Sequence, residues 1–496
     1  MLKLLRSLRF GNRSLNPTTK NKVMVSLICS YVSQAFNTGV NMLARLLLAR
    51  LILPADWGLF AEALLIITIG GAMRDLGIPL HLIRDNGKKY GSALMLEGIM
   101  SLVVISLIWI LAPQAHIWDP RLPYLLRIFS LMLLPEGLAM IPRAFLDKEL
   151  LVDKALLCEL LQIGTFALVS LAMGHRGYGV WSLVAGHSTG MLAYSLSLWL
   201  RAGRTISLEF NKRHIPELLF RSSFLFFNGL VGTSLGYIDN GILGSLLTSH
   251  EVGYYFIAYT WAFLPNKLIF PSLYRIFYPT LARYKDDVER LFNIYHLGTI
   301  ILLAVELPVL ALIFINAQHY VLLLLGRQWL PSVPLLRIIA LGPALVPFNR
   351  LGIAVLKVHH RDKIFFLSSI IGLVSLLVLG WLLTLRFRAM GMAYANLISP
   401  GSLVQLYGLA LVLGGRLWKM AFDLSLLYAV CAAVFIPIGI LFHPASASAS
   451  LGLGFIGMAI CWIIYYAMFG KNIRAILALR RGKDEELSET DSEVLA

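Results

Sequence analysis

The chain has 496 residues, of which 58% are hydrophobic and 14% are charged, whereas a soluble globular domain is usually about 25% charged. Apolar stretches of about 20 residues, enough to cross the hydrocarbon core of a bilayer, recur along the whole chain. The composition therefore excludes a soluble protein. It predicts an all-α polytopic membrane protein, because open sheets cannot satisfy their backbone hydrogen bonds in lipid.

Fourteen transmembrane helices are predicted from the apolar stretches. The spans cover residues 23–48, 57–79, 92–112, 121–142, 154–174, 178–200, 218–248, 252–280, 291–315, 333–356, 364–385, 390–413, 422–442 and 451–470. Residues 1–22 alternate leucines with cations, which predicts a basic amphipathic segment on the cytoplasmic membrane surface. Residues 471–496 are polar and acidic, and we predict a disordered cytoplasmic tail.

The distribution of lysine and arginine orients the chain. With the N-terminus in the cytoplasm, thirty of the 43 basic residues fall in cytoplasmic segments and six in the opposite loops. This positive-inside bias predicts that both termini are cytoplasmic. The net charge of +16 is typical of nucleic-acid-binding proteins as well, but topology explains it here, and no nucleic-acid partner is predicted.

A short pattern occurs twice in the chain, as LILPADWGLFAEAL and as LLTSHEVGYYFIAY. In each copy an apolar helix is followed by an acid, one apolar residue, a glycine and aromatic residues. Asp56 and Gly58 in the first copy match Glu251 and Gly253 in the second. We interpret these four as structural corner residues, with glycine allowing a tight turn and the acid capping the next helix.

Two further matches follow in the same order on equivalent spans: residues 153–154 match 362–363, and residues 176–179 match 388–391. Together they predict a duplication in which the two halves run in the same direction through the membrane. Parallel six-helix repeats around a central cavity are an architecture of transporters.

The duplication predicts the domain organisation. The N-lobe would be residues 23–200, with the first six spans, and the C-lobe residues 218–413, with the next six. A cytoplasmic linker, 201–217, would join them, and two extra helices would lie in 422–470 outside the repeats.

No motif for catalysis was found in the chain. A P-loop and an H-E-x-x-H motif are both missing from the sequence, and the four cysteines lie in apolar runs without metal-ligand spacing. The longest stretch between spans, 201–217, is too short for a catalytic domain. We therefore predict that the protein is not an enzyme and has no catalytic residues, metal or cofactor.

Charged side chains inside spans are the candidate functional residues, because each costs about 2.5–3.5 kcal/mol to insert at a helix centre and should face protein or water. Arg45, Asp239 and Lys267 lie well inside the spans around the repeated corners. We expect at least one of them to contact a substrate or a coupling ion. Arg74 and Asp75 lie near a helix end, where a local pair that reaches the membrane surface is the structural alternative.

Other charges in the spans have both a structural and a functional interpretation. Glu97, Glu136 and Glu159 are candidate buried partners of Arg127. His187 could relay protons, although its serine and threonine neighbours favour a packed histidine.

The segment ARLILPADWGLFAEALLIITIGGAMRDLGIPLHLIR, residues 49–84, resembles the signature region of bacterial polysaccharide flippases. These belong to the superfamily of multidrug, oligosaccharidyl-lipid and polysaccharide exporters. The resemblance covers about residues 20–415. It rests on the acid-x-Gly-Leu corner, Asp75-Leu-Gly77, an arginine near the end of the second span, Asp239 with Gly244, Gly253-Tyr254, Ala258 and Pro265. Glu62 departs from the pattern. The two extra helices suit fourteen-span exopolysaccharide or colanic-acid-like exporters and resemble the lipid II flippase topology.

The resemblance implies a transporter of the bacterial inner membrane that rocks between inward-open and outward-open states. Its substrate would be an undecaprenyl-diphosphate-linked glycan, moved from the cytoplasmic to the periplasmic leaflet for exopolysaccharide, capsule or O-antigen synthesis. Glycosyltransferases and polymerase or export machinery would be its functional partners. Arg45, Arg127, Lys267 and Arg350 would line a cationic cavity that replaces the hydration of the diphosphate, while the polyprenyl tail stays in membrane lipid. Asp239 would bind a coupling H⁺ or Na⁺.

Two other functions remain open. An ion-coupled drug or metabolite antiporter of the same superfamily would share the fold. A membrane polymerase or ligase of polysaccharide synthesis is disfavoured by the short external loops and the duplicated halves.

Overall fold

The structure, a computed structural model, describes residues 37–470 apart from 79–81, 83–88, 150, 203–205, 207–208, 213, 399–400 and 442–448. The predicted amphipathic segment, the start of the first span and the predicted C-terminal tail lie outside the described residues. Within them the secondary structure is helical and contains no strand. Ten of their helices are long and apolar enough to cross a membrane. The prediction of an all-helical polytopic membrane protein is thus confirmed.

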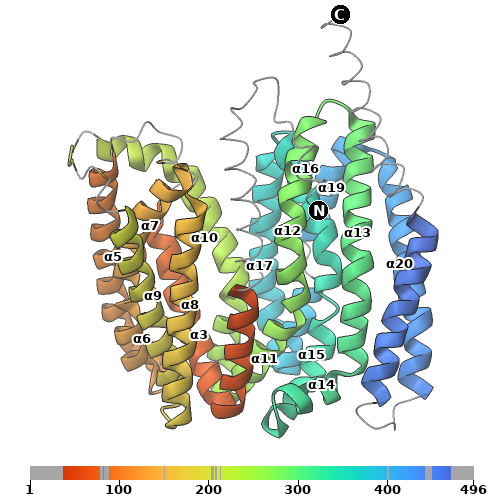
Figure 1. Cartoon of the computed structure of the whole chain (residues 1–496), viewed down its shortest axis with the longest axis horizontal. Coiled ribbons are helices and arrows are strands. Elements are labelled where there is room, and N and C mark those ends of the chain that lie inside the picture. The colour runs from red at the N-terminus through yellow and green to blue at the C-terminus, as the bar shows by residue number, and fades with distance from the viewer. Residues whose placement is uncertain are drawn as a thin grey trace, which may run out of the picture. The chain divides into compact units, whose positions relative to one another are not determined.

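A helix over residues 37–51 precedes the labelled helices of Figure 1. The helices that follow in the first half are α3 (Pro54–Arg74), α5 (Tyr90–Leu111), α6 (Leu122–Ser130), α7 (Leu133–Lys148), α8 (Val152–His175), α9 (Val180–Ala202), α10 (His214–Leu246) and α11 (Ser249–Ala262). A 3-10 helix, Ala112–Ile117, follows α5.

The second half contains α12 (Leu264–Arg283), α13 (Val288–Ile315), α14 (Ala317–Leu324), α15 (Val333–Ile339), α16 (Val346–Val358), α17 (Asp362–Phe387), α18 (Ala389–Ile398), α19 (Gly401–Leu413) and α20 (Arg416–Leu441). A last helix covers residues 449–470.

Four of the fourteen predicted spans, the first, sixth, seventh and eighth, are not among the ten helices. The sixth corresponds to α9, which is 23 residues long but carries several serines and a histidine that lower its apolarity. The eighth is interrupted at Phe263, where α11 ends and α12 starts with Pro265 in its first turn. Proline has no N–H to continue the hydrogen bonds of the preceding helix. The count of fourteen therefore stays a prediction.

The chain forms two compact units. Unit 1 contains the described residues within Met1–Ile257, with Leu324–Trp329 and Leu376–Met392. Unit 2 contains Ala258–Leu323, Leu330–Ser375 and the described residues from Ala393 onward. This division differs from the predicted N-lobe and C-lobe, whose boundary lies in 201–217. The two lobes stay a prediction.

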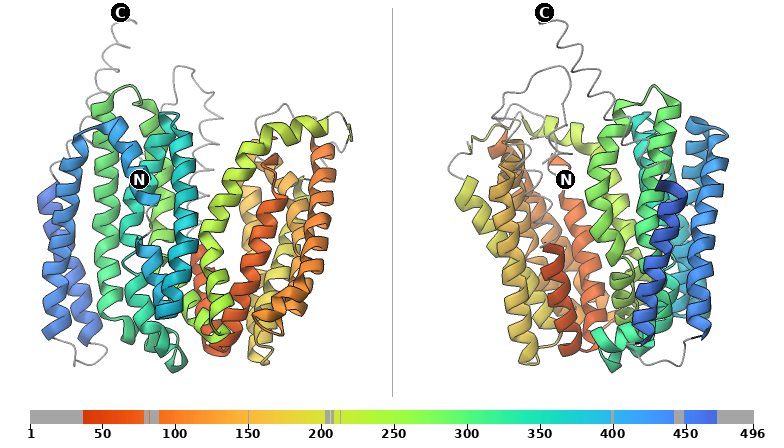
Figure 2. Two further views of the ribbon diagram at one scale, coloured as in Figure 1. Left: turned by 180° about the vertical axis from the view of Figure 1, so that it is seen from behind. Right: turned by 45° about the vertical axis from the view of Figure 1, so that its right-hand side comes forward.

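The core of unit 1 includes α8 and α9, which lie side by side in Figures 1 and 2. Gly186 and Gly190 are one turn apart on α9 and face α8, and a Cβ on Gly190 would lie 2.8 Å from the backbone oxygen of Gln162. Small residues at this spacing let helix backbones approach closely in a membrane. The glycines thus explain the tight pairing of these two helices.

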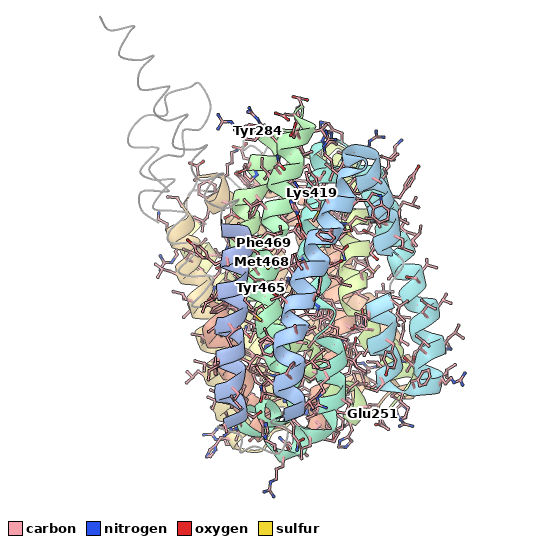
Figure 3. The ribbon with its side chains drawn as sticks, turned by 90° about the vertical axis from the view of Figure 1, so that its right-hand side faces the viewer. Glu251, Tyr284, Lys419, Tyr465, Met468 and Phe469 are labelled. Atoms are coloured by element: carbon pink, nitrogen blue, oxygen red, sulfur yellow. The ribbon has the colours of Figure 1, made fainter. Side chains whose placement is uncertain are left out.

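The last two described helices, α20 and residues 449–470, pack against α13 in unit 2. The indole of Trp462 donates a hydrogen bond to the Ala304 carbonyl, 3.1 Å away, and the Tyr465 hydroxyl donates to the Leu427 carbonyl of α20 at 2.8 Å. Figure 3 shows Tyr465, Met468 and Phe469 on the last helix, beside α20. Cys431 and Cys461 are buried in the same core as free thiols.

Candidate functional site

The two repeated corners meet in unit 1. A Cβ added to Gly58 of α3 would collide with the backbone oxygen of Ser249, and one added to Gly253 of α11 would collide with that of Pro54. Both glycines lie inside helices and not in turns. Their predicted role in a tight turn is therefore wrong. Each glycine is instead required because the first turns of α3 and α11 cross at backbone contact.

The two corner acids form ion pairs with arginines. Asp56 accepts from Arg121 at 3.1 Å, and both oxygens of Glu251 accept from Arg388, at 2.7 and 2.6 Å. Asp56 lies in the first turn of α3, whose N-cap residue is Leu53 and has no side-chain cap. The predicted capping role is therefore wrong for Asp56, because the carboxylate is already inside the helix and points to an arginine.

Asp119 connects the first corner to the second. It accepts hydrogen bonds from the side chain and backbone of Arg121 and from the Ser249 hydroxyl of the second corner. Burial alone would raise the pKa of Asp119, but these hydrogen bonds outweigh burial and lower that pKa below its ordinary value. The hydrogen bond to Asp119 in turn raises the pKa of Arg121. Sequence reasoning missed Asp119, although an acid two residues before an arginine in a short turn is a recognisable local pair.

The segment before α15 also contacts the first corner. The side chains of Gln328 and Trp329 both donate to the Ala49 carbonyl at 2.7 Å, and Arg50 donates to the Leu324 carbonyl at 2.9 Å. We call the four corner residues, with Asp119, Arg121, Ser249 and Arg388, the corner assembly. Unit 1 thus holds the acid and the glycine of both copies of the repeated pattern at one place.

The two predicted cations of unit 1 are half-buried. Arg45 donates from Nε to the Asn41 side chain, one turn earlier on the helix over residues 37–51, at 2.8 Å. Arg127 lies in the last turn of α6, and its Nε has no hydrogen-bond partner among the described residues. An intramembrane arginine without a protein partner at this atom is a candidate functional residue.

The other two predicted cations, Lys267 of α12 and Arg350 of α16, are exposed side chains of unit 2. The Arg350 guanidinium lies over the Phe270 ring, 4.9 Å from its centre. Arg350 also interacts with Glu306 of α13, whose fully buried carboxylate has no hydrogen-bond partner in the described part of the chain. The buried side chain of Asn266 lies at the same place.

Sequence reasoning did not single out Asn266, although an amide between Pro265 and Lys267 in an apolar run was the available signal. The structure brings Asn266, Glu306 and Arg350 together. The four predicted cations are divided between the units, two in each, and their role at a common cavity stays a prediction.

Asp239 is buried on α10 in unit 1. It accepts hydrogen bonds from the Tyr255 hydroxyl of α11 at 2.9 Å and from the Asn240 backbone at 2.8 Å. The amide oxygen of Asn240 is buried and has no hydrogen-bond partner among the residues that the structure describes. A buried carboxylate inside a membrane helix is a candidate site for a coupling cation or proton. Tyr255 was not identified from the sequence.

His187 lies among aromatic rings and not in a polar chain. The ring centres of Phe60, Phe129 and Phe166 are 5.9, 6.0 and 5.5 Å from that of the imidazole. This supports the packed interpretation of the histidine over a proton relay.

The buried acids have partners other than those expected. Arg74 pairs with Glu97 at 3.7 Å and with Glu136 at 3.4 Å, and Glu159 pairs with Arg143 of α7. The prediction that these glutamates are partners of Arg127 is therefore wrong. Asp75 accepts from the Gly77 backbone and is not in an ion pair with its neighbour in the described structure.

The comparisons with known proteins agree with this fold. A family of proteins described as "Polysaccharide biosynthesis protein" matches residues 47–334. The succinoglycan biosynthesis transport protein ExoT of Rhizobium meliloti (strain 1021) is 21% identical over 372 residues, 73% of this chain and 74% of the relative. The lipopolysaccharide biosynthesis protein WzxC of Escherichia coli (strain K12) is 23% identical over 327 residues, 62% of this chain and 64% of that protein.

Solved structures with the same fold include the lipid II flippase MurJ in an inward closed conformation. It has a TM-score of 0.72 and 15% identity over 91% of this chain and 99% of that structure. An inward-facing multidrug resistance transporter of the MATE family has a TM-score of 0.59 and 17% identity, covering 75% of this chain and 93% of its own. The resemblance to polysaccharide flippases seen in the sequence is thus confirmed at the level of family and fold. Because the match at residues 47–334 spans more than half of the chain, this protein belongs to the polysaccharide biosynthesis protein family.

Proposed function

We propose that the protein is a flippase that moves an undecaprenyl-diphosphate-linked oligosaccharide from the cytoplasmic to the periplasmic leaflet of a bacterial inner membrane by alternating access. The observation that carries this proposal is the match of more than half of the chain to the polysaccharide biosynthesis family. The relative ExoT, named as a succinoglycan biosynthesis transport protein, supports transport as the activity. In this proposal the chain has fourteen spans in two six-helix lobes with two extra helices, and both termini are cytoplasmic.

The chemistry of the substrate gives the intramembrane cations a role. A diphosphate carries about two negative charges, and an ion of that size cannot enter hydrocarbon without replacement of its hydration. Arg45, Arg127, Lys267 and Arg350 would supply that replacement. The membrane potential would assist outward movement by about 2.3 kcal/mol per uncompensated charge at 100 mV.

Accumulated glycolipid is the direct test of the proposed function. Deletion of the gene is expected to abolish the surface polymer and to leave the complete lipid-linked oligosaccharide in the cytoplasmic leaflet, where an impermeant periplasmic probe does not reach it. Accumulation on the periplasmic side would instead indicate a polymerase or ligase. An intact polymer with altered toxin sensitivity would indicate a drug or metabolite antiporter.

Asp239 is proposed to bind the coupling H⁺ or Na⁺. Asp239→Asn is expected to reduce the dependence of transport on an imposed ion gradient at least about tenfold, equivalent to ~1.4 kcal/mol of lost coupling. Tyr255→Phe removes the hydroxyl that donates to Asp239 and should weaken the ion response in the same direction. Transport by proteoliposomes under imposed Na⁺ and pH gradients measures both. Unchanged gradient dependence in Asp239→Asn would show that Asp239 is not the coupling site.

A further inference from the structure

A buried charged cluster lies where α3, α5 and α7 meet in unit 1, and neither the proposed substrate site nor the corner assembly uses it. The Arg74 guanidinium, at the end of α3, lies 3.7 Å from Glu97 of α5 and 3.4 Å from Glu136 of α7. It also donates to the Leu133 carbonyl at 2.8 Å. We call Arg74, Glu97 and Glu136 the acid pair cluster.

Burial makes the charge balance of the acid pair cluster important. The Arg74 side chain is 1% exposed and that of Glu97 is 0% exposed. Both carboxylate oxygens of Glu97 and the Nε of Arg74 are buried without a hydrogen-bond partner among the described residues. If all three groups were ionised, one positive charge would face two negative charges, and one negative charge would remain without compensation in a membrane helix bundle.

Helix packing provides the space for the cluster. A Cβ on Gly137 of α7 would lie 3.2 Å from the Arg74 side chain and 2.5 Å from the Ser101 hydroxyl of α5. Gly71 lies beside Glu136, with its Cβ position 3.9 Å from the carboxylate. Gly137 on α7 thus lets the Arg74 side chain fit between the three helices, and at Gly71 a Cβ would make only ordinary contacts.

The surrounding charges do not correct the imbalance. Besides Arg74 and Glu136, the charged group that acts on Glu97 is Asp75, which adds to the negative side. Charged groups farther along α7 and on the helices α8 and α10 have other partners. Arg143 of α7 pairs with Glu159 of α8, and Asp239 of α10 is hydrogen-bonded to Tyr255.

The two remaining neighbouring helices carry their own titratable groups. His187 of α9 is surrounded by phenylalanine rings. The backbone oxygen of Arg127 in α6 accepts a hydrogen bond from the Trp109 indole. The Arg127 side chain is not among the groups that act on Glu97.

We propose that the acid pair cluster is a proton-binding site, in which Glu97 and Glu136 share one proton beside Arg74. With one proton bound, the three groups carry no net charge, so that the buried cluster is compensated. Glu136 is 27% exposed, and it therefore provides the route by which the proton enters and leaves. This proposal does not rest on the proposed function.

A proton suits the cluster better than a metal ion. The guanidinium lies within 4 Å of both carboxylates and would repel a cation bound between them. Two acids that cannot both ionise at one site share a single proton, as coupled carboxylates do elsewhere. A proton requires no further ligands and no larger space.

The test counts the protons released when the purified full-length chain is unfolded by detergent at about pH 7, where solvent-exposed carboxyl groups are ionised. Glu97→Gln and Glu136→Gln are each expected to release about one proton fewer per chain than the wild type, because either substitution leaves a neutral Arg–Glu pair. Glu306→Gln is the matched control. It alters a buried glutamate of unit 2. In the double variant with Glu97→Gln, the changes in the number of released protons should add.

Several results would overturn the shared site. Wild-type proton release in both single variants would show that the cluster holds no proton, and a loss in Glu97→Gln alone would show that Glu136 does not share it. Proton release that falls when sodium chloride replaces choline chloride would identify a metal-ion site instead.

A measurement on the wild type covers the case in which a variant does not fold. Dicyclohexylcarbodiimide reacts with protonated buried carboxyl groups. It is expected to label Glu97 or Glu136 at neutral pH and less at alkaline pH, as read by peptide mass spectrometry. Absence of label on both glutamates at neutral pH would refute the proposal. None of these measurements uses a glycolipid, so failure of the proposed function would leave their results unaffected.

Discussion

Gly58→Ala and Gly253→Ala are each expected to destabilise unit 1 by about 3 kcal/mol or more, at the upper end of the usual cost of overpacking. The added methyl group would meet the Ser249 or the Pro54 backbone oxygen, and neither carbonyl can rotate away as a side chain could. The helices would have to separate, which would also break the hydrogen bond that the Ser249 hydroxyl donates to Asp119. The thermal midpoint of the purified protein and its abundance in the membrane measure the effect.

Gly232→Ala is the matched control for these two substitutions. Gly232 lies within α10, and a Cβ added there would meet nothing within 4 Å among the described residues. Alanine in place of a helical glycine stabilises a helix by about 1 kcal/mol, so this variant should be as stable as the wild type or more so. Equal stability of all three variants would show that the backbones of α3 and α11 do not cross at these glycines.

Arg45→Ala and Lys267→Ala are each expected to reduce polymer output at least about tenfold, which corresponds to ~1.4 kcal/mol of lost stabilisation of the diphosphate. Removing one partner of a desolvated charge pair typically costs more than ~1.4 kcal/mol. Membrane abundance should stay at the wild-type level, because Arg45 is half-buried and Lys267 is exposed. Surface polymer and immunoblots of the membrane fraction provide the two readouts.

Two further variants separate charge from side-chain packing. Arg45→Lys keeps the positive charge and is expected to retain more activity than Arg45→Ala. Arg386→Ala removes an exposed cation at the end of α17 and should leave polymer output unchanged. Wild-type polymer levels in both Arg45→Ala and Lys267→Ala would refute the assignment of these cations to the substrate.

The corner assembly gives a physical reason for the repeated pattern. In a membrane, the hydrophobic effect does not drive helices together, so close packing of small residues and polar contacts must do so. Gly58 and Gly253 supply the close approach, and the pairs of Asp56 with Arg121 and of Glu251 with Arg388 tie the adjoining turns. The two copies of the pattern thus form a single contact within unit 1.

Several properties of this protein follow from the sequence alone. The long apolar stretches determine a helical membrane protein, because lipid offers no hydrogen bonds to an open backbone. The region around residues 49–84 identified the family that the match at 47–334 then confirmed. The recurrence of an acid and a glycine at Asp56, Gly58, Glu251 and Gly253 marked the two helix starts whose glycines, Gly58 and Gly253, meet in the structure.

The tertiary structure decided which groups meet and what the glycines do. Arg74 was adjacent to Asp75 in sequence, yet its partners are Glu97 and Glu136. The sequence predicted Gly58 to be a turn residue, yet it lies inside α3 against the backbone of Ser249. The reason is that spacing along the chain places side chains on the faces of one helix, whereas a partner on another helix depends on the rotation and depth at which the two helices pack.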